Sequence, residues 1–263
     1  MHDPLRATRI GGPTVLVELA GWRILIDPTF DPPGRRYSFG LGTSSVKTQG
    51  PFVAADAVGD IDLVLLSHDH HADNLDDAGR ALLSTARSVV TTASGARRLA
   101  LPRATGLVAH RSTELSSPGR PDLTVTATPG RHGPPFTRAL VGDVIGFAVQ
   151  LAGESGTALW VTGDTVLTRA VTRAARERDI DVAIVNAGGV RFPRTGPLRY
   201  TMTGADAVKL IAAAEPRVAL PAHYDGWSHF VDGEAGFRAA VDRAPAAVRH
   251  RVRWLPDGEP AEV

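Results

Sequence analysis

The chain has 263 residues, of which 43% are hydrophobic and 22% charged, so it has the composition of an ordinary globular protein that can bury a full core. Its net charge of +1 gives no reason to expect nucleic acid or an anionic membrane surface as a partner. The absence of cysteine excludes disulfides and thiolate ligands, so any metal must be held by histidine and carboxylate. With no apolar stretch of membrane-spanning length and no apolar core in the first residues, the expected location is the cytoplasm.

The sequence pattern of residues 14–66 predicts a hairpin, a long connection and a buried strand. Residues 14–20 and 22–27 are rich in β-formers and separated by Gly21, which favours a hairpin. Residues 28–60 are rich in Pro and Gly and contain no periodic segment. A connection of this length is either a functional loop or lid, or a disordered surface excursion. The apolar run 61–66 then predicts a strand that is buried on both faces.

The rest of the chain alternates predicted helices and strands, which favours a layered α/β arrangement. Helices are predicted at 75–86, with Asp or Asn at its N-terminus, and at 95–100, 166–178, 203–214 and 234–242. Strands are predicted at 88–92, 105–109, 123–128, 143–151, 158–162, 181–185, 217–220 and 252–255. Thr203 and Asp206 resemble a capping box. Because no linker or repeat separates these elements, residues 1–263 are predicted to form a single domain.

A dense group of polar side chains follows the run 61–66. The sequence there is Ser67-His68-Asp69-His70-His71-Ala72-Asp73-Asn74. On an extended segment, His68 and His70 are two residues apart and can direct their ring nitrogens at one metal ion. Neutral imidazole suits Zn or Fe, and a nearby carboxylate suits a second divalent ion. The alternative is a solvated polar loop in which Asp73 caps the following helix.

Three further candidate ligands each lie directly after a predicted strand. They are His132, Asp164 and His223. In α/β proteins ligands bind at the carboxyl ends of the strands, so these residues are expected to converge with His68 and His70. His110 also follows a strand, and we interpret it as a supporting or surface residue.

With these motifs the sequence resembles the metallo-β-lactamase-fold hydrolase superfamily, and within it the branch of ascorbate-phosphate lactonase and N-acyl-phosphatidylethanolamine phospholipase D. The matching segments, in order, are Asp27-Pro28, Ser67-His68-Asp69-His70, Asp73, residues 128–132, residues 162–165 and Pro221-Ala222-His223. The resemblance implies an α+β fold, a four-layer αββα sandwich. In this fold two mixed β-sheets lie face to face, the helices lie outside, and the metals lie at one edge between the sheets.

The resemblance also implies the ligands. His68, His70 and His132 would hold a first metal, Asp164 would bridge, and Asp73 and His223 would hold a second. The implied cofactor is one or two Zn²⁺ ions, with Mn²⁺ or Fe as alternatives.

One departure from the family concerns the second metal. The usual motif is His-x-His-x-Asp-His, whereas this one is a residue longer and has Asn74 where a second-metal histidine belongs. Either His71 or the Asn74 carbonyl replaces that histidine, or the second site is weak or empty. We expect a well-formed first site and a weakened second one.

The activity that the resemblance implies is hydrolysis of a small ester, lactone or phosphodiester by a metal-activated water. Asp73 and Asp164 are the expected catalytic carboxylates. His229 is a candidate to contact substrate or protonate a leaving group. The alternatives are a metal-dependent nuclease and a non-catalytic metal-binding descendant of the fold.

The expected partner is a small molecule, with neither nucleic acid nor a membrane. Three arginines follow the strand at 181–185, namely Arg191, Arg194 and Arg199. They could bind an anionic substrate, or they could form a solvated surface loop.

Overall fold

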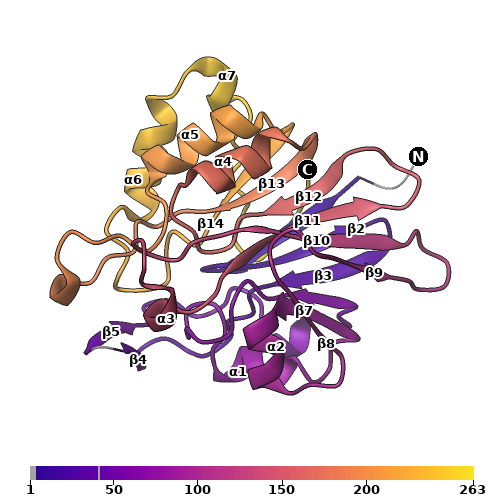
Figure 1. Ribbon diagram of the computed structural model, residues 1–263, viewed down its shortest axis with the longest axis horizontal. Coiled ribbons are helices and arrows are strands. Elements are labelled where there is room, and N and C mark those ends of the chain that lie inside the picture. Colours follow the sequence, from indigo (N-terminus) through magenta and orange to yellow (C-terminus); the bar gives the residue numbers. More distant parts are fainter. Residues whose placement is uncertain (1–3, 41) are drawn as a thin grey trace.

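Two β-sheets packed face to face form the centre of the protein, and helices cover both outer faces (Figure 1). The computed structural model describes residues 4–40 and 42–263. The first sheet has the strand order β15-β1-β2-β3-β6-β7-β8. Its strands are β1 (Arg6–Gly11), β2 (Thr14–Leu19), β3 (Trp22–Ile26), β6 (Leu63–Leu65), β7 (Ser88–Thr92), β8 (Ala104–Leu107) and β15 (Pro260–Glu262).

The second sheet has the order β14-β13-β12-β11-β10-β9, and a small third sheet pairs β4 with β5. The second sheet contains β9 (Ser112–Leu115), β10 (Leu123–Pro129), β11 (Ile145–Leu151), β12 (Thr157–Val161), β13 (Ile180–Asn186) and β14 (Val218–Ala222). The third contains β4 (Arg36–Gly40) and β5 (Thr43–Val46). Each large sheet is mixed, because antiparallel pairs at one end give way to parallel pairs at the other.

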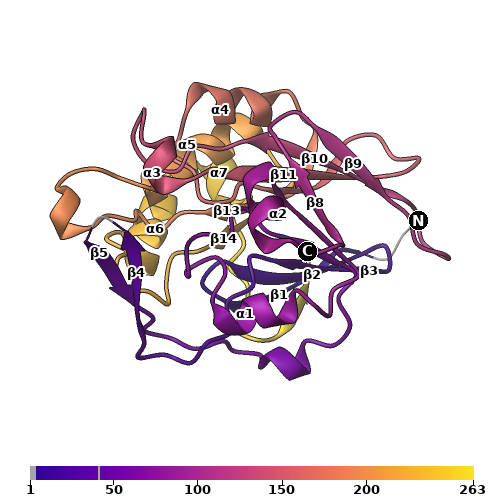
Figure 2. The same ribbon diagram turned by 60° about the horizontal axis from the view of Figure 1, so that its bottom comes forward.

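Helices α1 and α2 lie outside the first sheet, and α4 to α7 lie outside the second (Figures 1 and 2). The helices are α1 (Asp77–Leu82), α2 (Ala93–Leu99), α3 (Arg138–Val141), α4 (Arg169–Arg176), α5 (Gly204–Ala214), α6 (Gly233–Asp242) and α7 (Ala246–Arg249). Two 3₁₀ turns, η1 (Ala55–Ala57) and η2 (Pro193–Thr195), lie in connections. None of the described helices combines the length and the apolar character that crossing a membrane requires.

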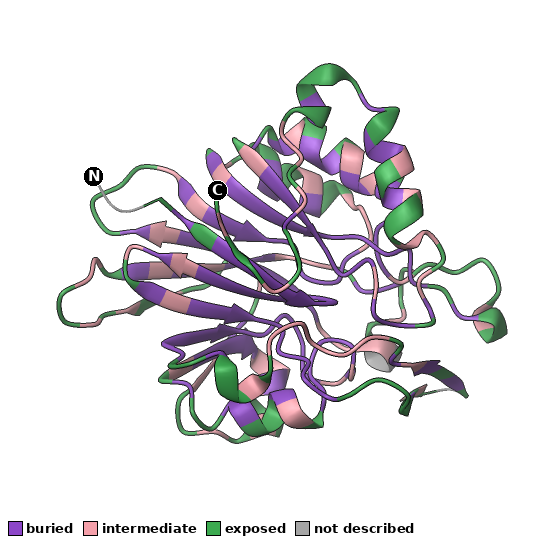
Figure 3. Cartoon of the chain, turned by 180° about the vertical axis from the view of Figure 1, so that it is seen from behind, coloured by how far each residue is buried: buried purple, intermediate pink, exposed green. Residues whose placement is uncertain are grey.

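The main core lies between the two large sheets, because their strands alternate apolar and polar residues. Along β10, for example, Leu123, Val125 and Ala127 are fully buried, whereas Thr124 and Thr126 are partly exposed. The buried strands and the exposed outer faces of the helices are visible in Figure 3. A second apolar cluster joins the second sheet to α4–α7, and a third joins the first sheet to α1. The predicted αββα sandwich is therefore confirmed.

Several predicted elements are confirmed, and two need correction. The hairpin at 14–27 and the capping box of Thr203 and Asp206 are present. The helix expected at 75–86 is shorter, and its N-cap is Asp76, whose side chain accepts from the Gly79 backbone N–H. The strand expected at 252–255 does not form; only an isolated bridge joins Val252 to Ala219. After α1, residues 83–85 form hydrogen-bonded turns that do not continue the α-helix. Near the C-terminus, Arg251 and Arg253 exchange backbone hydrogen bonds with Ala219.

The segment 28–60 contains the β4–β5 hairpin, which is anchored by buried polar contacts. Lys47 Nζ lies 2.7 Å from Asp76 Oδ2, and both side chains are almost fully buried. The Tyr37 hydroxyl donates to Asp31 Oδ2 over 2.5 Å. On the other side, the Val46 backbone N–H donates to the hydroxyl of Ser228 over 2.9 Å. The segment is thus a structured element that joins the start of α1 to the loop after β14.

Candidate metal centre

Four strands of the two large sheets end at a common edge and place polar side chains there. His68 follows β6 in the first sheet. His132, Asp164 and His223 follow β10, β12 and β14 in the second. The strands form because their apolar residues pack between the sheets, and each polar residue begins where the apolar run stops. The site is therefore built from the loops that continue these strands.

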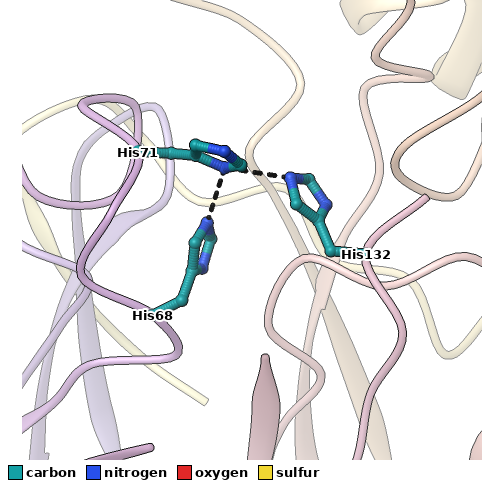
Figure 4. Close-up of side chains that lie close together, drawn as sticks. All are labelled: His68, His71 and His132. Atoms are coloured by element: carbon teal, nitrogen blue, oxygen red, sulfur yellow. Dashed lines mark hydrogen bonds between the residues drawn. The ribbon is translucent and has the colours of Figure 1, made fainter. Parts of the chain in front are cut away.

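Three histidines form the first group of candidate ligands, here called the histidine cluster: His68, His71 and His132 (Figure 4). His71 Nδ1 lies 3.2 Å from His68 Nε2 and 3.0 Å from His132 Nε2. All three side chains are buried. Three ring nitrogens that face one another cannot all be satisfied by hydrogen bonds among themselves. Their lone pairs are instead placed to share one cation.

Two of these rings are oriented by contacts at the ring nitrogen that does not face the cluster. His132 Nδ1 donates to the Tyr200 backbone carbonyl over 2.9 Å, which leaves Nε2 with its lone pair toward the cluster. His68 Nδ1 lies 3.0 Å from the hydroxyl of Ser67. Such contacts at the far nitrogen are those that fix the tautomer of metal-binding histidines.

Asp73, Asp164 and His223 form a second group, here called the acidic cluster, whose ligand atoms lie within 4.8 Å of one another. His223 Nδ1 donates to Asp164 Oδ1 over 2.7 Å, and its Nε2 lies 3.7 Å from Asp73 Oδ2. Asn186 Nδ2 also donates to Asp164 Oδ1, over 3.0 Å. The backbone of His223 is in the left-handed region, with φ of 54°, and its N–H donates to the Gly12 carbonyl. This unfavourable conformation is typical of residues whose position matters for a site.

Unpaired buried atoms converge on the acidic cluster. Asp73 Oδ1, Asp164 Oδ2, His223 Nε2 and Asn74 Oδ1 are all buried and make no hydrogen bond within the described structure. Buried polar atoms are nearly always paired, because an unpaired one loses its hydration without compensation. Carboxylate oxygen, amide oxygen and imidazole nitrogen are donors that a divalent cation accepts. The residues present therefore fit the metal that the sequence motifs imply.

Residues 22–224 match the family model of the beta-lactamase superfamily domain. The chain belongs to this family. A relative from Pelotomaculum thermopropionicum, named UPF0173 metal-dependent hydrolase, is 26% identical over 264 residues, which cover 98% of this chain and 100% of the relative.

Solved structures share the fold of this superfamily member. A possible metal-dependent hydrolase from Veillonella parvula has a TM-score of 0.80 at 20% identity and covers 99% of this chain and 100% of its own. An isothiocyanate hydrolase from Delia radicum gut bacteria has a TM-score of 0.77 at 18% identity, covering 97% and 98%. At these identities the likeness establishes the fold.

The two clusters of this superfamily domain differ in charge. Burial lowers the pKa of His68, His71 and His132. Neighbouring imidazoles lower it further for His68 and His71, and for His132 burial outweighs the opposing effect of the Asp164 and Asp73 carboxylates, so the histidine cluster is neutral at pH 7. Burial also acts to lower the pKa of His223, but the adjacent Asp164 carboxylate outweighs it and raises the pKa to about 9. In the same pair, burial acts to raise the pKa of Asp164, and the charge of His223 lowers it to about 2.

The structure places His71, and not the predicted His70, in the histidine cluster. His70 Nε2 donates to the Val141 carbonyl, and the ring packs against Gly142, where a β-carbon would lie 2.1 Å from ring atoms. The prediction assumed an extended segment, but residues 67–75 form turns, and the additional residue in the motif rotates His70 away. Alignment from the C-terminal end of the motif, where His71-Ala72-Asp73-Asn74 matches His-x-Asp-His, would have found His71.

Asn74 lies beside the acidic cluster but is held by other groups. Its Nδ2 donates to Asp27 Oδ2 over 3.2 Å and to Ser67 Oγ over 3.4 Å, and its Oδ1 is left unpaired. Asp27 also accepts from the Ser67 backbone N–H over 2.6 Å, and burial raises the pKa of this carboxyl to about 7. Of the two alternatives for the missing histidine, the Asn74 carbonyl lies beside the acidic cluster, whereas His71 lies in the histidine cluster.

His229 is brought to the acidic cluster, whereas the three arginines are not. His229 is buried, and its Nε2 lies 3.3 Å from Asp73 Oδ2. Its ring stacks on Trp227, with an interplanar angle of 12°. Arg191, Arg194 and Arg199 are all exposed.

Proposed function

We propose that the protein is a metal-dependent hydrolase that uses a metal-activated water on a small ester, lactone or phosphodiester. The observation that carries this proposal is the convergence of the histidine and acidic clusters, with four unpaired buried ligand atoms, at the ends of the strands. The relative named as a metal-dependent hydrolase, which matches along its whole length, supports the same conclusion.

In this proposal, each cluster supplies the ligands of one ion. His68, His71 and His132 would hold the first ion. The second would be held by Asp73, Asp164 and His223, with Asn74 Oδ1 as a weak additional donor. Divalent ions bound there, as Zn²⁺ or alternatively Mn²⁺ or Fe, would lower the pKa of a water and polarise the substrate oxygen.

Asp73 and His229 are placed to move a proton. Asp73 Oδ1 is unpaired and can take the proton of the attacking water. His229 Nε2, 3.3 Å from Asp73 Oδ2, can pass a proton to the leaving group. Asp164 holds His223 in a fixed orientation through their 2.7 Å hydrogen bond. These roles make Asp73, Asp164 and His229 the catalytic residues of the proposal.

The test combines metal content with a substrate screen. Protein prepared with and without added Zn²⁺ or Mn²⁺ is assayed against lactones, acyl esters, phosphodiesters and phenyl isothiocyanate, the last because a structural neighbour is an isothiocyanate hydrolase. We expect hydrolysis that disappears on chelation and returns with metal. Bound metal with no turnover of any substrate would favour a non-catalytic binding protein, and cleavage of polynucleotides alone would favour a nuclease.

A further inference from the structure

A small cavity lies against both metal-ligand clusters. Its volume is about 30 Å³, and its lining includes His71 and His132 of the histidine cluster and Asp73 of the acidic cluster. A substrate must reach both clusters to react in the proposed way, and this cavity is in contact with both. We call it the aromatic pocket, because the wall facing the ligands is formed by Phe39, Phe192 and Tyr200.

The three aromatic rings of this wall pack against one another and against the histidines. The Phe39 centroid lies 5.6 Å from that of Phe192 and 5.3 Å from that of His71. The Phe192 centroid lies 5.6 Å from that of Tyr200, and the Tyr200 centroid lies 6.0 Å from that of His132. Since these separations are those of ordinary aromatic contacts, the rings form a continuous apolar surface beside the candidate ligands.

This surface comes from two projecting segments. Phe39 is on the β4–β5 hairpin, and Phe192 precedes η2. In both ribbon views, these segments project on the same side of the molecule (Figures 1 and 2). The hairpin is tied down by Lys47 and Asp76, so the aromatic wall is part of the folded structure.

Among the described side chains, none that lines the aromatic pocket is a lysine or an arginine. Its acidic member is Asp73, whose charge an ion bound at the acidic cluster would offset. Lys47 is buried in its ion pair with Asp76. The loop arginines are exposed, and Arg191 borders a different hollow. An anionic group placed against the rings of Phe39 and Phe192 would therefore lose its hydration without gaining a cationic side chain as a partner.

We infer that the aromatic wall selects esters or lactones whose acyl group is small, apolar and uncharged and packs against the rings of Phe39 and Phe192. The cavity itself has room for about one water molecule. The inference rests on the proposed function. In the reaction, the oxygen of water bonds to the acyl carbon and the acyl C–O bond breaks. One proton of the water goes to the leaving oxygen, so that an acid and an alcohol are the products.

A larger hollow lies on the other side of His132 and provides the control. Its volume is about 500 Å³, and Phe136, which is fully exposed, lies on its rim. It includes His132 but neither His71 nor a residue of the acidic cluster. Substitution of Phe136 thus removes the same ring from a place that the inference does not use.

The kinetic experiment compares two esters with the same leaving group and acyl chains of similar length. They are p-nitrophenyl butyrate, which is neutral, and p-nitrophenyl hemisuccinate, whose acyl chain ends in a carboxylate. With metal-loaded protein we expect kcat/KM to be at least about tenfold higher for the butyrate. Phe192→Ala and the milder Phe39→Leu should each lower this value about tenfold for the butyrate and leave the hemisuccinate within about twofold. Phe136→Ala should change neither ester.

Two kinetic outcomes would overturn the inference. One is equal or faster cleavage of the hemisuccinate, particularly if Arg191→Ala then removes it. The other is a loss of butyrate cleavage in Phe136→Ala but not in Phe192→Ala, which would place the substrate in the larger hollow.

A binding measurement separates the inference from the proposed function. Cyclopentanone has the shape of a small lactone but has no bond to hydrolyse, and its binding to metal-loaded protein can be followed by saturation-transfer NMR. We expect a signal in the wild type and in Phe136→Ala, and its loss in Phe192→Ala and Phe39→Leu. This binding pattern without turnover of any ester would contradict the proposed hydrolase function and support the aromatic pocket as a binding site. Ester turnover without this binding pattern would contradict the role of the aromatic pocket and leave the proposed hydrolase function standing.

Discussion

The histidine cluster and the acidic cluster lie side by side but are held in different ways without metal. In the first, burial keeps three imidazoles neutral, and their nitrogens face one another with no partner of opposite charge. In the second, His223 and Asp164 already form an ion pair over 2.7 Å. A metal entering the acidic cluster must compete with a proton on His223, whereas one entering the histidine cluster does not. The two sites are therefore expected to fill in order, the histidine cluster first.

The largest expected effect is that of Asp164→Ala. Because this carboxylate has one oxygen on His223 and the other unpaired toward the cluster, its removal should abolish turnover, by about a thousandfold or more. Metal analysis should find the second ion lost and the first retained, with an unchanged circular dichroism spectrum. Asp181→Ala, at an exposed ion pair with Arg217, is the matched control and should remain active. Loss of both ions in Asp164→Ala would contradict the separation of the clusters.

The next effect separates His71 from His70. His71→Ala removes a nitrogen that lies 3.0 Å from His132 Nε2, so the affinity for the first ion should fall at least about a hundredfold. His70→Ala removes the contact with the Val141 carbonyl and ring packing against His68 and His71, but no nitrogen of the histidine cluster, so it should change that affinity by no more than about threefold. Titration of metal-free protein with chelator-buffered Zn²⁺ measures both. The reverse ranking would restore the extended geometry predicted from the sequence.

The pH dependence of metal affinity should also differ between the clusters. The pKa of His223 is raised to about 9, so between pH 6.5 and 9 the second ion must displace a proton, and its affinity should rise by up to about tenfold per pH unit. The histidine cluster is already neutral above pH 6.5, so the affinity for the first ion should be nearly constant there. Chelator-buffered titrations at several pH values give both slopes. Equal slopes for the two ions would be inconsistent with this account.

The smallest effect concerns the stability of metal-free protein. Because the pKa of His223 is raised in the folded state, its protonation stabilises that state fully below the ordinary pKa of 6.5. This contribution is lost as the pH rises toward 9. The free energy of unfolding should therefore fall by about 1 to 3 kcal/mol between pH 6.5 and 9. Urea unfolding in the presence of chelator measures it, and His223→Gln should remove the alkaline decline. If the decline persists in that variant, another group causes it.

The fold and the strand-end residues could be predicted because their signals are local. Apolar runs of strand length end at His68, His132, Asp164 and His223, and the packing of two sheets brings these ends together. The choice between His70 and His71 does not follow from the strand ends, and only alignment of the motif from its C-terminal end points to His71. The choice depends on a turn whose shape is fixed by contacts with Val141 and Gly142, about seventy residues away.

The aromatic pocket could not be predicted from sequence patterns for a similar reason. The strands β4 and β5 have five and four residues. The sequence of β4 alternates polar and aromatic residues, but that of β5 contains a single apolar residue. The two strands form because distant residues hold them, chiefly Asp76 and Ser228. Tertiary contacts of this kind override weak local preference, so Phe39 could not be placed beside the site beforehand.

The β4–β5 hairpin forms part of the pocket wall, but none of its described residues supplies an atom to either ligand cluster. The donors come from the ends of strands in the two large sheets, and the hairpin is attached to that framework mainly through Lys47 and Ser228. Under the two proposals, coordination and selectivity are therefore encoded in separate parts of the chain. A grafted hairpin of another length or composition, provided that it keeps those two attachments, would give the same catalytic centre a different substrate range.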